Sequence, residues 1–239
     1  MKRKSIAFLL FLFPCSFCRF LFSLLNIQGV HIGRNCKVGF SLLLSPKIDL
    51  EDGSRIGHCN YINVNSFYLG GGIVRCFNII KGTIDVRFEN KSWMHSFNKI
   101  SGVAIYKANH FVVRKDTQIG MWHVFNVSDS IEIGANSCMA GSGSQVWTHS
   151  FLYGKEKKVR VDGEVKIGDN CYIGSRVVIC PGVKIANNIS IGANTTVTKN
   201  LEKPGLYVSQ PIRYIEEWNA DEQISKLGIE VSENICRKR

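Results

Sequence analysis

Aliphatic residues recur at every sixth position in two long stretches of this sequence. The later series is Ile167, Ile173, Ile179, Ile185, Ile191 and Val197, and the earlier one is Ile32, Val38, Leu44, Leu50, Ile56 and Ile62. A shorter series contains Val113, Ile119, Phe125 and Ile131, after which the phase shifts by two residues to Ile133. A period of six fits neither the 3.6-residue turn of an α-helix nor the two-residue alternation of a plain strand. The chain must therefore turn sharply after each short extended segment.

The residues between the aliphatic positions support this interpretation. A small residue often follows the aliphatic one, as at Gly168 and Gly174, and a smaller apolar residue stands four positions after it, as at Cys171 and Val177. Asparagines such as Asn170, Asn188 and Asn194 tolerate turn conformations. Hexapeptide repeats of this kind are typical of a parallel β-helix, which makes the chain an all-β protein.

Three six-residue sides close a triangular coil of about 18 residues, so residues 18 apart stack directly on each other. Ile167 then shares a side with Ile185, and Ile173 with Ile191, while Ile179 and Val197 share the third side. From Ile32 to Leu201 the chain is long enough for about nine coils. The phase is broken over residues 66–112, where we expect Phe67, Ile73 and Ile79 to continue the coils.

We expect three segments: residues 1–29, the β-helix over 30–203, and a C-terminal helical tail over 204–239 anchored by Ile212, Ile215 and Trp218. In the first segment Ser16, Arg19, Ser23 and Asn26 fall on one face of a predicted helix, and apolar residues fill the rest. Such a helix can lie in a membrane interface, with Lys2–Lys4 attracted to anionic lipid. A signal peptide or membrane span, and a helix packed on the protein, remain alternatives.

Charge and cysteine content exclude some function classes. The net charge is +11, but residues 1–29 carry four excess positive charges and Arg237–Arg239 three more, so most of the excess lies at the ends. A nucleic-acid-binding protein more often carries a basic stripe through its fold, so we expect no nucleic acid. The nine cysteines form only one C-x-x-C pair, Cys15–Cys18, which argues against a zinc site and favours small core residues in a reducing, cytoplasmic compartment.

The segments IGDNCYIGSRVVICPGVKI (167–185) and IGANTTVTKN (191–200) resemble the hexapeptide-repeat acyltransferases. The resemblance implies a left-handed parallel β-helix of about nine triangular coils with short N- and C-terminal helices. It also implies acetyl-CoA as the acyl donor, no metal, and a homotrimer whose active sites lie between adjacent prisms.

The segment AGSGSQVWTHS (140–150) resembles the part of sugar O-acetyltransferases of this family that carries the catalytic histidine, especially those of cell-surface polysaccharide loci. This implies that His149 is the general base. The repeat also fails between Thr148 and Val165, and the excursion of residues 150–164 is rich in lysine and arginine. Such an excursion beside a prism can form the wall of a pocket, and a neutral imidazole suits a general base near pH 7.

Further site residues follow from the resemblance and from spacing. The donor-binding positions that the resemblance implies are Ser175, Ala193, Thr198 and Lys199, and Tyr172 stands where relatives often carry a tryptophan. His123 and Asp129 precede His149 by about one coil, and each can orient the imidazole or face the acceptor. Trp147 shares a strand face with His149. Each of these residues also has a structural alternative. Ser175 and Ala193 can simply satisfy turn geometry, Lys199 can be a solvated surface lysine, and Trp147 can fill a corner of the prism.

The sequence therefore predicts an acetyl-CoA-dependent O-acetyltransferase acting on a sugar hydroxyl of a cell-surface polysaccharide, such as a lipopolysaccharide, or its precursor. We expect a cytoplasmic enzyme with peripheral contact to the inner membrane face through residues 1–29. N-acylation of an amino sugar and a non-catalytic β-helix scaffold remain alternatives. A zinc enzyme of the carbonic-anhydrase type needs three converging imidazoles, but no histidine follows His149.

Overall fold

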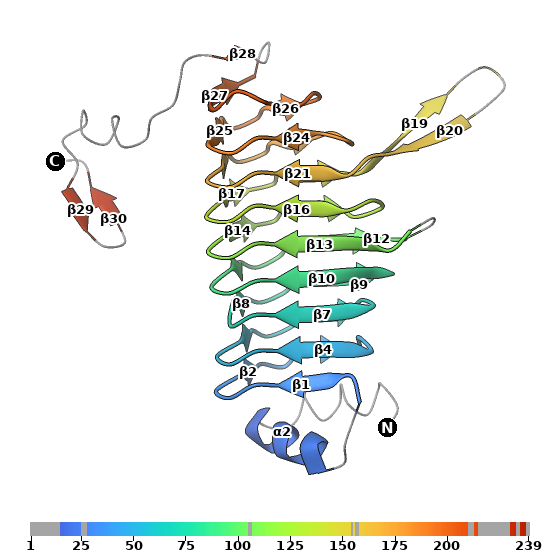
Figure 1. Cartoon of the computed structure of the whole chain (residues 1–239), viewed down its shortest axis with the longest axis vertical. Coiled ribbons are helices and arrows are strands. Elements are labelled where there is room, and N and C mark those ends of the chain that lie inside the picture. The colour runs from blue at the N-terminus through green and yellow to red at the C-terminus, as the bar shows by residue number, and fades with distance from the viewer. Residues whose placement is uncertain are drawn as a thin grey trace.

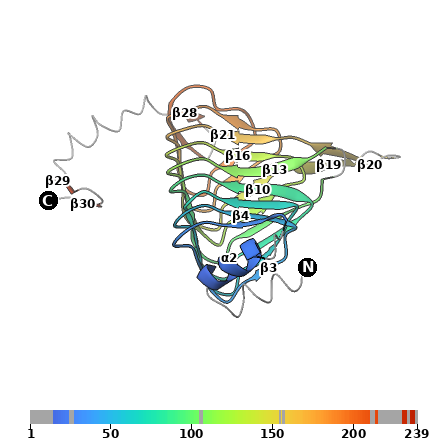
Figure 2. The same cartoon turned by 60° about the horizontal axis from the view of Figure 1, so that its bottom comes forward.

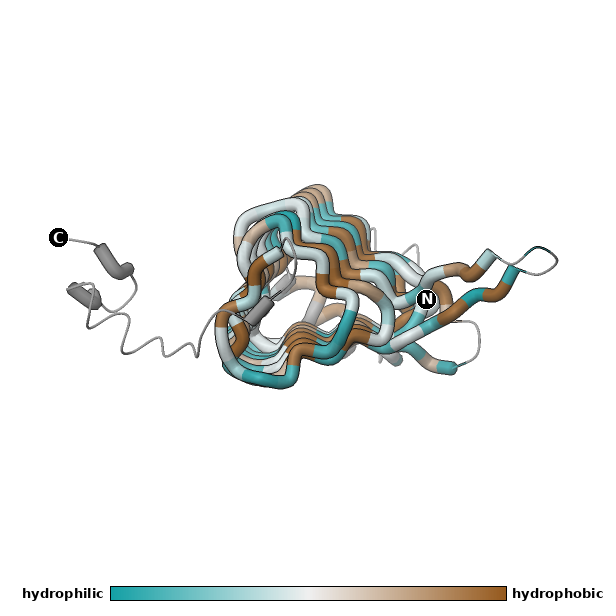
Figure 3. Tube along the Cα trace, turned by 90° about the horizontal axis from the view of Figure 1, so that it is seen from above, coloured by the Kyte–Doolittle hydropathy of each residue, from teal (hydrophilic) through white to brown (hydrophobic). Residues whose placement is uncertain are grey.

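The structure is a computed structural model that describes residues 15–24, 28–104, 107–153, 155, 158–209, 213–214, 230–232 and 235–237. Short parallel strands form three long sheets, which we call A, B and C, and the chain visits them in turn (Figure 1). Seen from above, the coils form a three-sided outline with one hairpin projecting from a corner (Figure 3). We name each corner by the two sheets that it joins.

The strand bounds are as follows. Sheet A contains β1 (Val30–Ile32), β4 (Lys47–Leu50), β7 (Ser66–Leu69), β10 (Ile84–Phe88), β13 (Asn109–Val113), β16 (Ile131–Ile133), β21 (Val165–Ile167) and β24 (Lys184–Ile185). Sheet B contains β2 (Lys37–Val38), β5 (Arg55–Ile56), β8 (Ile73–Val74), β11 (Trp93–Met94), β14 (Gln118–Met121), β17 (Cys138–Ser142), β22 (Tyr172–Ile173), β25 (Ile189–Ile191), β27 (Gly205–Val208) and β28 (Arg213–Tyr214). Sheet C contains β3 (Leu42–Leu43), β6 (Tyr61–Asn63), β9 (Ile79–Gly82), β12 (Lys99–Gly102), β15 (Val124–Asn126), β18 (Gln145–Trp147), β23 (Val178–Ile179) and β26 (Thr196–Val197). Two antiparallel pairs, β19 (His149–Tyr153) with β20 (Lys158–Asp162) and β29 (Glu230–Ser232) with β30 (Ile235–Arg237), lie outside these sheets.

The predicted stacking of the later series is confirmed in all three sheets. Ile167 pairs with Ile185 in sheet A, Ile173 with Ile191 in sheet B, and Ile179 with Val197 in sheet C. All six side chains are buried. The turn asparagines Asn170, Asn188 and Asn194 adopt φ values of 56°, 60° and 58°, the left-handed conformation that asparagine tolerates. The parallel β-helix of about nine coils is therefore confirmed.

Phe67, Ile73 and Ile79 continue the coils as predicted, on β7, β8 and β9, but at Leu44, Ile73 and Ile79 the inward-facing residue is one position away from the expected one. Leu43, not Leu44, pairs with Ile62, and the inward-facing residues of the third coil are Val74 and Ile80. Ile73 and Ile79 face outwards and are 36% and 43% exposed. The reason is a change in turn length. Four residues, 51–54, connect β4 to β5, whereas only the three glycines 70–72 connect β7 to β8.

The interior of the middle coils is filled by aromatic rings. Phe111 is fully buried, and its ring lies 6.0 Å from that of Phe88 and 4.9 Å from that of Phe125, with the latter pair edge-to-face. Such edge-to-face contacts are favourable because the positive ring edge meets the negative ring face. Of the cysteines in the described part of the chain, Cys36 and Cys171 are buried core residues, as predicted, whereas Cys59 is exposed.

The two ends of the prism are covered differently. Helix α2 (Cys15–Leu24) lies across the first coil, where Cys18 is buried in the core and Leu21 packs against it (Figure 2). Its Phe20 is 65% exposed. At the other end β27 pairs parallel with β25, so the start of the predicted helical tail is instead a strand that continues sheet B, and the tail also contains the strands β28, β29 and β30. The predicted anchors Ile212, Ile215 and Trp218, and Lys2–Lys4 at the start, lie outside the described residues. Among those described, no helix is both long and apolar enough to cross a membrane.

Candidate active site

The predicted excursion is a two-stranded hairpin at the CA corner. Strand β18 ends at Trp147, Thr148 turns the corner, and His149 opens β19 opposite Asp162 of β20. The N–H of Gly163 donates to the carbonyl oxygen of Thr148 at 2.9 Å, which closes the base of the hairpin. After the hairpin, strand β21 pairs in parallel with β16, so sheet A continues without interruption. His149 therefore stands where the projecting hairpin meets the prism.

Three side chains orient the imidazole of His149. Its Nδ1 lies 2.8 Å from Oδ1 of Asn126, which is on the strand directly below β18. The ring contacts Trp147 at 6.3 Å and Phe151 at 5.6 Å, both edge-to-face. Because an amide oxygen only accepts hydrogen bonds, Nδ1 carries the proton and donates it, so Nε2 keeps a lone pair. A fixed tautomer of this kind is what a general base requires.

The surroundings keep this imidazole neutral. Partial burial lowers the pKa of His149 below its ordinary value of 6.5, and the positive charge of Arg160 lowers it further, while Asp162 opposes both. Arg160 donates from Nε to Oδ1 of Asp162 at 2.8 Å, so the two charges form one ion pair beside the ring. His149 can therefore accept a proton at neutral pH.

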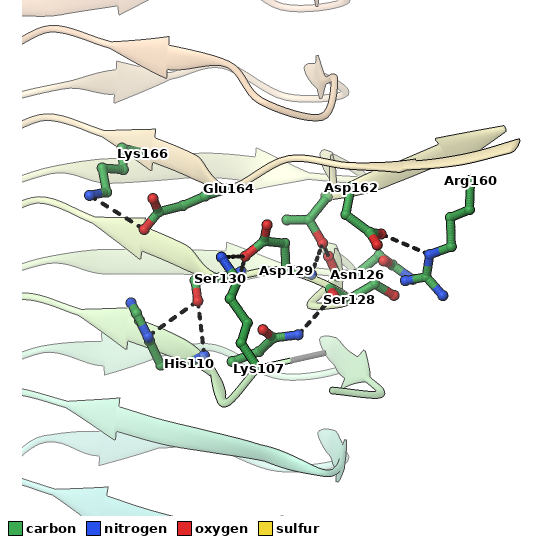
Figure 4. A network of polar contacts seen from close by, with 12 residues as sticks. Lys107, His110, Asn126, Ser128, Asp129, Ser130, Arg160, Asp162, Glu164 and Lys166 are labelled. Carbon is green, nitrogen blue, oxygen red and sulfur yellow. Dashed lines mark hydrogen bonds and ion pairs between the residues drawn. The ribbon is translucent and has the colours of Figure 1, made fainter. Parts of the chain in front are cut away.

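Asp129 lies at the same corner but supports the chain around it (Figure 4). Its carboxylate accepts a hydrogen bond from the N–H of Ser130 at 2.7 Å and pairs with Nζ of Lys107 at 2.8 Å. Its own N–H donates to Oγ1 of Thr148 at 2.8 Å, and that hydroxyl donates to the carbonyl oxygen of Asn126 at 2.7 Å. The backbone N–H of Asp129 thus holds the turn that precedes His149, while its carboxylate binds Ser130 and Lys107.

His123 is not brought to this site. It precedes β15 at the BC corner, whereas Asn126 ends that strand at the CA corner. The imidazole is fully buried, and its Nδ1 accepts a hydrogen bond from the N–H of Ser144 at 3.0 Å. Burial lowers the pKa of His123 to about 4, so the ring is neutral in the folded protein. In one chain it orients a turn rather than His149.

The predicted donor-binding residues fall at two edges of sheet C. Thr198 and Lys199 are exposed and follow β26, at the same edge as His149 and two strands along the sheet from β18. Ser175 and Ala193 lie in successive turns of the BC corner, at the opposite edge. Tyr172 is 51% exposed on sheet B. A single chain therefore gathers His149, Trp147, Thr198 and Lys199, and leaves Tyr172, Ser175 and Ala193 apart from them.

The sequence reasoning missed Asn126. This residue pairs with Trp147, 21 positions later, because the coil between them is longer than the regular 18 residues. An amide one coil before the histidine is the only signal in the sequence, and it can be recognised only once coil lengths are known. Arg160 was noted only as part of a basic excursion and Asp162 was not singled out, since their approach to His149 depends on the hairpin register.

Comparison with known proteins agrees with this architecture. The family described as "Bacterial transferase hexapeptide (six repeats)" matches residues 164–199. Chloramphenicol acetyltransferase of Klebsiella aerogenes is 32% identical over 110 residues, which are 41% of this chain and 52% of the relative. Galactoside O-acetyltransferase of Escherichia coli (strain K12) is 30% identical over 123 residues, which are 49% of this chain and 56% of the relative. The chain thus spans about half the length of the curated relatives it matches.

A solved structure is similar in fold. The polysialic acid O-acetyltransferase OatWY aligns with a TM-score of 0.50 at 16% identity, over 79% of this chain and 89% of that one. The stacked coils and this likeness in fold show a left-handed parallel β-helix, and one of its corners carries the oriented imidazole of His149. More particularly, residues 164–199 carry the bacterial transferase hexapeptide repeat, and the predicted resemblance to the hexapeptide-repeat acyltransferases is confirmed.

Proposed function

We propose that this protein is an acetyl-CoA-dependent O-acetyltransferase that acts on a sugar hydroxyl of a cell-surface polysaccharide or its precursor. The observation that carries the proposal is the imidazole of His149, whose Nδ1 is fixed by Asn126 and whose Nε2 is available at a corner of the prism. The relatives named galactoside O-acetyltransferase and polysialic acid O-acetyltransferase support a sugar acceptor and an acetyl donor.

The chemistry is direct transfer. The acceptor hydroxyl gives its proton to Nε2 of His149 while its oxygen attacks the thioester carbonyl of acetyl-CoA. The resulting tetrahedral oxyanion collapses, the carbon–sulfur bond breaks, and the imidazolium returns the proton to the departing thiolate. The products are the acetyl ester and CoA, and His149 is neutral again. The step uses no metal and no covalent enzyme intermediate.

Residues near the imidazole suit the donor and the acceptor. Thr198 and Lys199 lie roughly 10 Å along the prism from the level of His149, since β26 is two inter-strand spacings of about 4.8 Å from β18. Lys199 is exposed and suits a phosphate of CoA as a compact point charge. Trp147 offers an aromatic surface beside the imidazole for the acceptor ring, and its Nε1 is held by Gln145 at 3.0 Å.

The active assembly is proposed to be a homotrimer. Tyr172, Ser175 and Ala193 lie on sheet B or at the BC corner, away from His149 of the same chain. A neighbouring copy can bring these residues to the imidazole, and a closed ring of copies completes every site in the same way. The site is then shared between chains, with His149 from one and part of the CoA wall from the next.

The test is release of CoA from acetyl-CoA by the full chain, measured with a thiol reagent and a panel of acceptors. Neutral hexoses, acidic sugars and oligosaccharides supply hydroxyl acceptors, while amino sugars test the N-acyl alternative. Acetyl ester formation on a hydroxyl acceptor, confirmed by mass spectrometry and by lability to mild base, supports the proposal. Transfer only to amines, or hydrolysis with no acceptor dependence, would overturn it.

The pH dependence of the reaction should report His149. Because its folded-state pKa lies below 6.5, kcat/KM should rise as pH increases through that lower pKa and stay level above it. Arg160→Gln should move the midpoint to higher pH, since it removes a positive charge and leaves Asp162 unpaired. Asp162→Asn should move it to lower pH. A midpoint that neither substitution moves would assign the titration to another group.

We also propose peripheral contact with the inner membrane face through residues 1–29, which places the enzyme in the cytoplasm. Helix α2 buries Cys18 and turns Phe20 outwards at the end of the prism. The full chain should therefore sediment with vesicles that contain anionic lipid, and Phe20→Ser should reduce the bound fraction several-fold. Leu152→Ser on the hairpin is the matched control and should sediment normally. Equal binding of all three proteins would count against this contact.

A further inference from the structure

A line of polar side chains crosses the outer face of sheet C below the level of His149. Strand register stacks one outward-facing residue on the next, in the order Trp147, Asn126, Ser101, Lys81 and Asn63. We call these five residues the polar row. Each is exposed or half-buried, whereas the residue before it on the strand is buried. The row spans four inter-strand spacings of about 4.8 Å, so it is roughly 20 Å long.

The polar row is continuous with the proposed catalytic centre. Its Asn126 holds Nδ1 of His149 at 2.8 Å, and the ring of its Trp147 lies 6.3 Å from the imidazole. The proposed donor-binding residues Thr198 and Lys199 follow β26, which lies on the other side of β18 in the sheet. A donor that reaches His149 from that side leaves the strands below β18 to the acceptor.

Sheet C is positively charged and contains no acid. In the described part of the chain, no Asp or Glu occurs in any strand of this sheet, whereas Lys81 in the polar row and Lys99, two residues before Ser101 on β12, are both exposed. Neither lysine takes part in an ion pair of the described residues. The acid that follows β15, Asp129, is already paired with Lys107 at 2.8 Å. The two ammonium groups can therefore meet an anionic ligand.

Sheet A has a different charge pattern. Its strands contain the acids Asp49, Asp85 and Glu132 among their basic residues, and Glu132 is paired with Arg114 at 2.6 Å. Opposite charges thus lie close together on sheet A, whereas on sheet C only positive charges occur in the described strands. A face that carries one sign of charge attracts ligands of the opposite sign.

A hollow lies at the lower end of the polar row. Its volume is about 350 Å³, and its lining residues are Pro46, Asn63, Val64, Asn65, Gly82 and Thr83. The side chains of Asn63 and Asn65 carry amides that both donate and accept hydrogen bonds. Oγ1 of Thr83 accepts a hydrogen bond from the N–H of Ala104 at 2.8 Å, which leaves its own proton to donate. Neutral donors and acceptors of this kind suit the hydroxyl groups of a sugar unit.

We propose that the acceptor is an acidic glycan chain, rather than a single sugar, and that it lies along the polar row. Its reacting unit is at His149, its acidic groups meet Lys81 and Lys99, and a further unit occupies the hollow. Acetyl transfer to this chain rests on the proposed function, whereas its binding does not. A row of roughly 20 Å exceeds the length of one sugar, so only a chain can contact all five strands.

The test is the binding of fluorescently labelled oligosaccharides to the full chain, measured by anisotropy without acetyl-CoA. The probes are fragments of polygalacturonate and of polysialic acid, from the disaccharide to the octasaccharide, together with the same fragments after reduction of their carboxyl groups. In at least one series the acidic octasaccharide should bind roughly tenfold more tightly than the disaccharide and than its own reduced form. Lys81→Gln with Lys99→Gln should remove this advantage, with an unchanged circular dichroism spectrum.

The matched control removes the same charge from another face. Lys115 and Lys184 follow β13 and begin β24, both are exposed, and neither is in an ion pair with any residue that the structure describes. Lys115→Gln with Lys184→Gln should therefore bind the octasaccharide as the parent chain does. An equal loss in the two double variants would assign binding to net charge and overturn the proposal.

Two further results would overturn it. Acidic fragments that bind no better than their reduced forms would remove the role of the lysines. Equal binding of disaccharide and octasaccharide would instead indicate a small anionic group, such as the diphosphate of a nucleotide sugar. Binding is read without the donor, so failure of the acetyltransferase assay alone leaves this inference intact. Where transfer occurs, Lys81→Gln with Lys99→Gln should raise KM for the octasaccharide roughly tenfold and leave KM for acetyl-CoA as it is.

Discussion

His149→Ala should lower acetyl transfer by about 10²–10⁴-fold, the usual contribution of a positioned general base. The loss should appear in kcat, because the imidazole acts on the acceptor proton. KM for acetyl-CoA should be nearly unchanged, because the proposed donor-binding residues Thr198 and Lys199 follow β26, two positions along sheet C from β18. CoA release under saturating donor measures the effect. Asn126→Ala should give a smaller loss in kcat, since the ring stays but its tautomer is no longer fixed by Oδ1.

The controls for this prediction separate chemistry from folding. His31→Ala removes an exposed imidazole on the first coil, whose Nδ1 lies 2.8 Å from Asp49, and should leave the rate unchanged. The melting temperature of His149→Ala should stay close to that of the parent, because the imidazole is only partly buried. Full activity of His149→Ala would remove the basis of the proposed mechanism.

Phe111→Ala should destabilise the protein by about 3–5 kcal/mol, the usual cost of removing a fully buried phenylalanine. The ring contacts Phe88 and Phe125 in the middle of the prism, so its removal leaves a cavity between these two rings. Urea unfolding followed by circular dichroism measures the change. Because each coil is stabilised mainly by its two neighbours, the transition should also broaden as the two halves begin to unfold separately.

A matched phenylalanine on the hairpin gives the comparison. Phe151 is 41% exposed and packs against His149 and Lys158 rather than the core. Phe151→Ala should therefore cost less than about 1 kcal/mol and leave the transition sharp. Equal effects of the two substitutions would mean that the interior of the prism contributes less than its packing indicates.

The fold was predictable where the repeat is regular. Ile167, Ile173 and Ile179 stack as expected because the inward-facing residues of that region recur at a constant spacing of six. Ile73 and Ile79 were misplaced because hydrophobicity alone does not distinguish them from Val74 and Ile80, and the shortened turn at Gly70–Gly72 decides between them. The length of each turn therefore decides which residue of the next strand faces inward, and the spacing of hydrophobic residues does not show turn lengths directly.

The site was predictable to the extent that its residues are close in sequence. His149 and Trp147 are neighbours on one strand face, and the structure places their rings side by side. The sequence did not show which of Asn126 and His123 contacts His149, although the two residues are only three positions apart. One ends β15 beside the imidazole and the other precedes the same strand inside the opposite corner. Which residue reaches His149 depends on where the strand begins.

The hairpin base has a consequence for how such proteins diversify. Gly163 and Thr148 join directly, and β21 returns to its place on β16 whatever the ribbon between them contains. Lengthening, shortening or exchanging the residues between Phe151 and Arg160 should therefore leave the stacked coils undisturbed. The outer part of the hairpin is then free to differ between related proteins, while Asn126, Phe151, Arg160 and Asp162 keep their places around the imidazole.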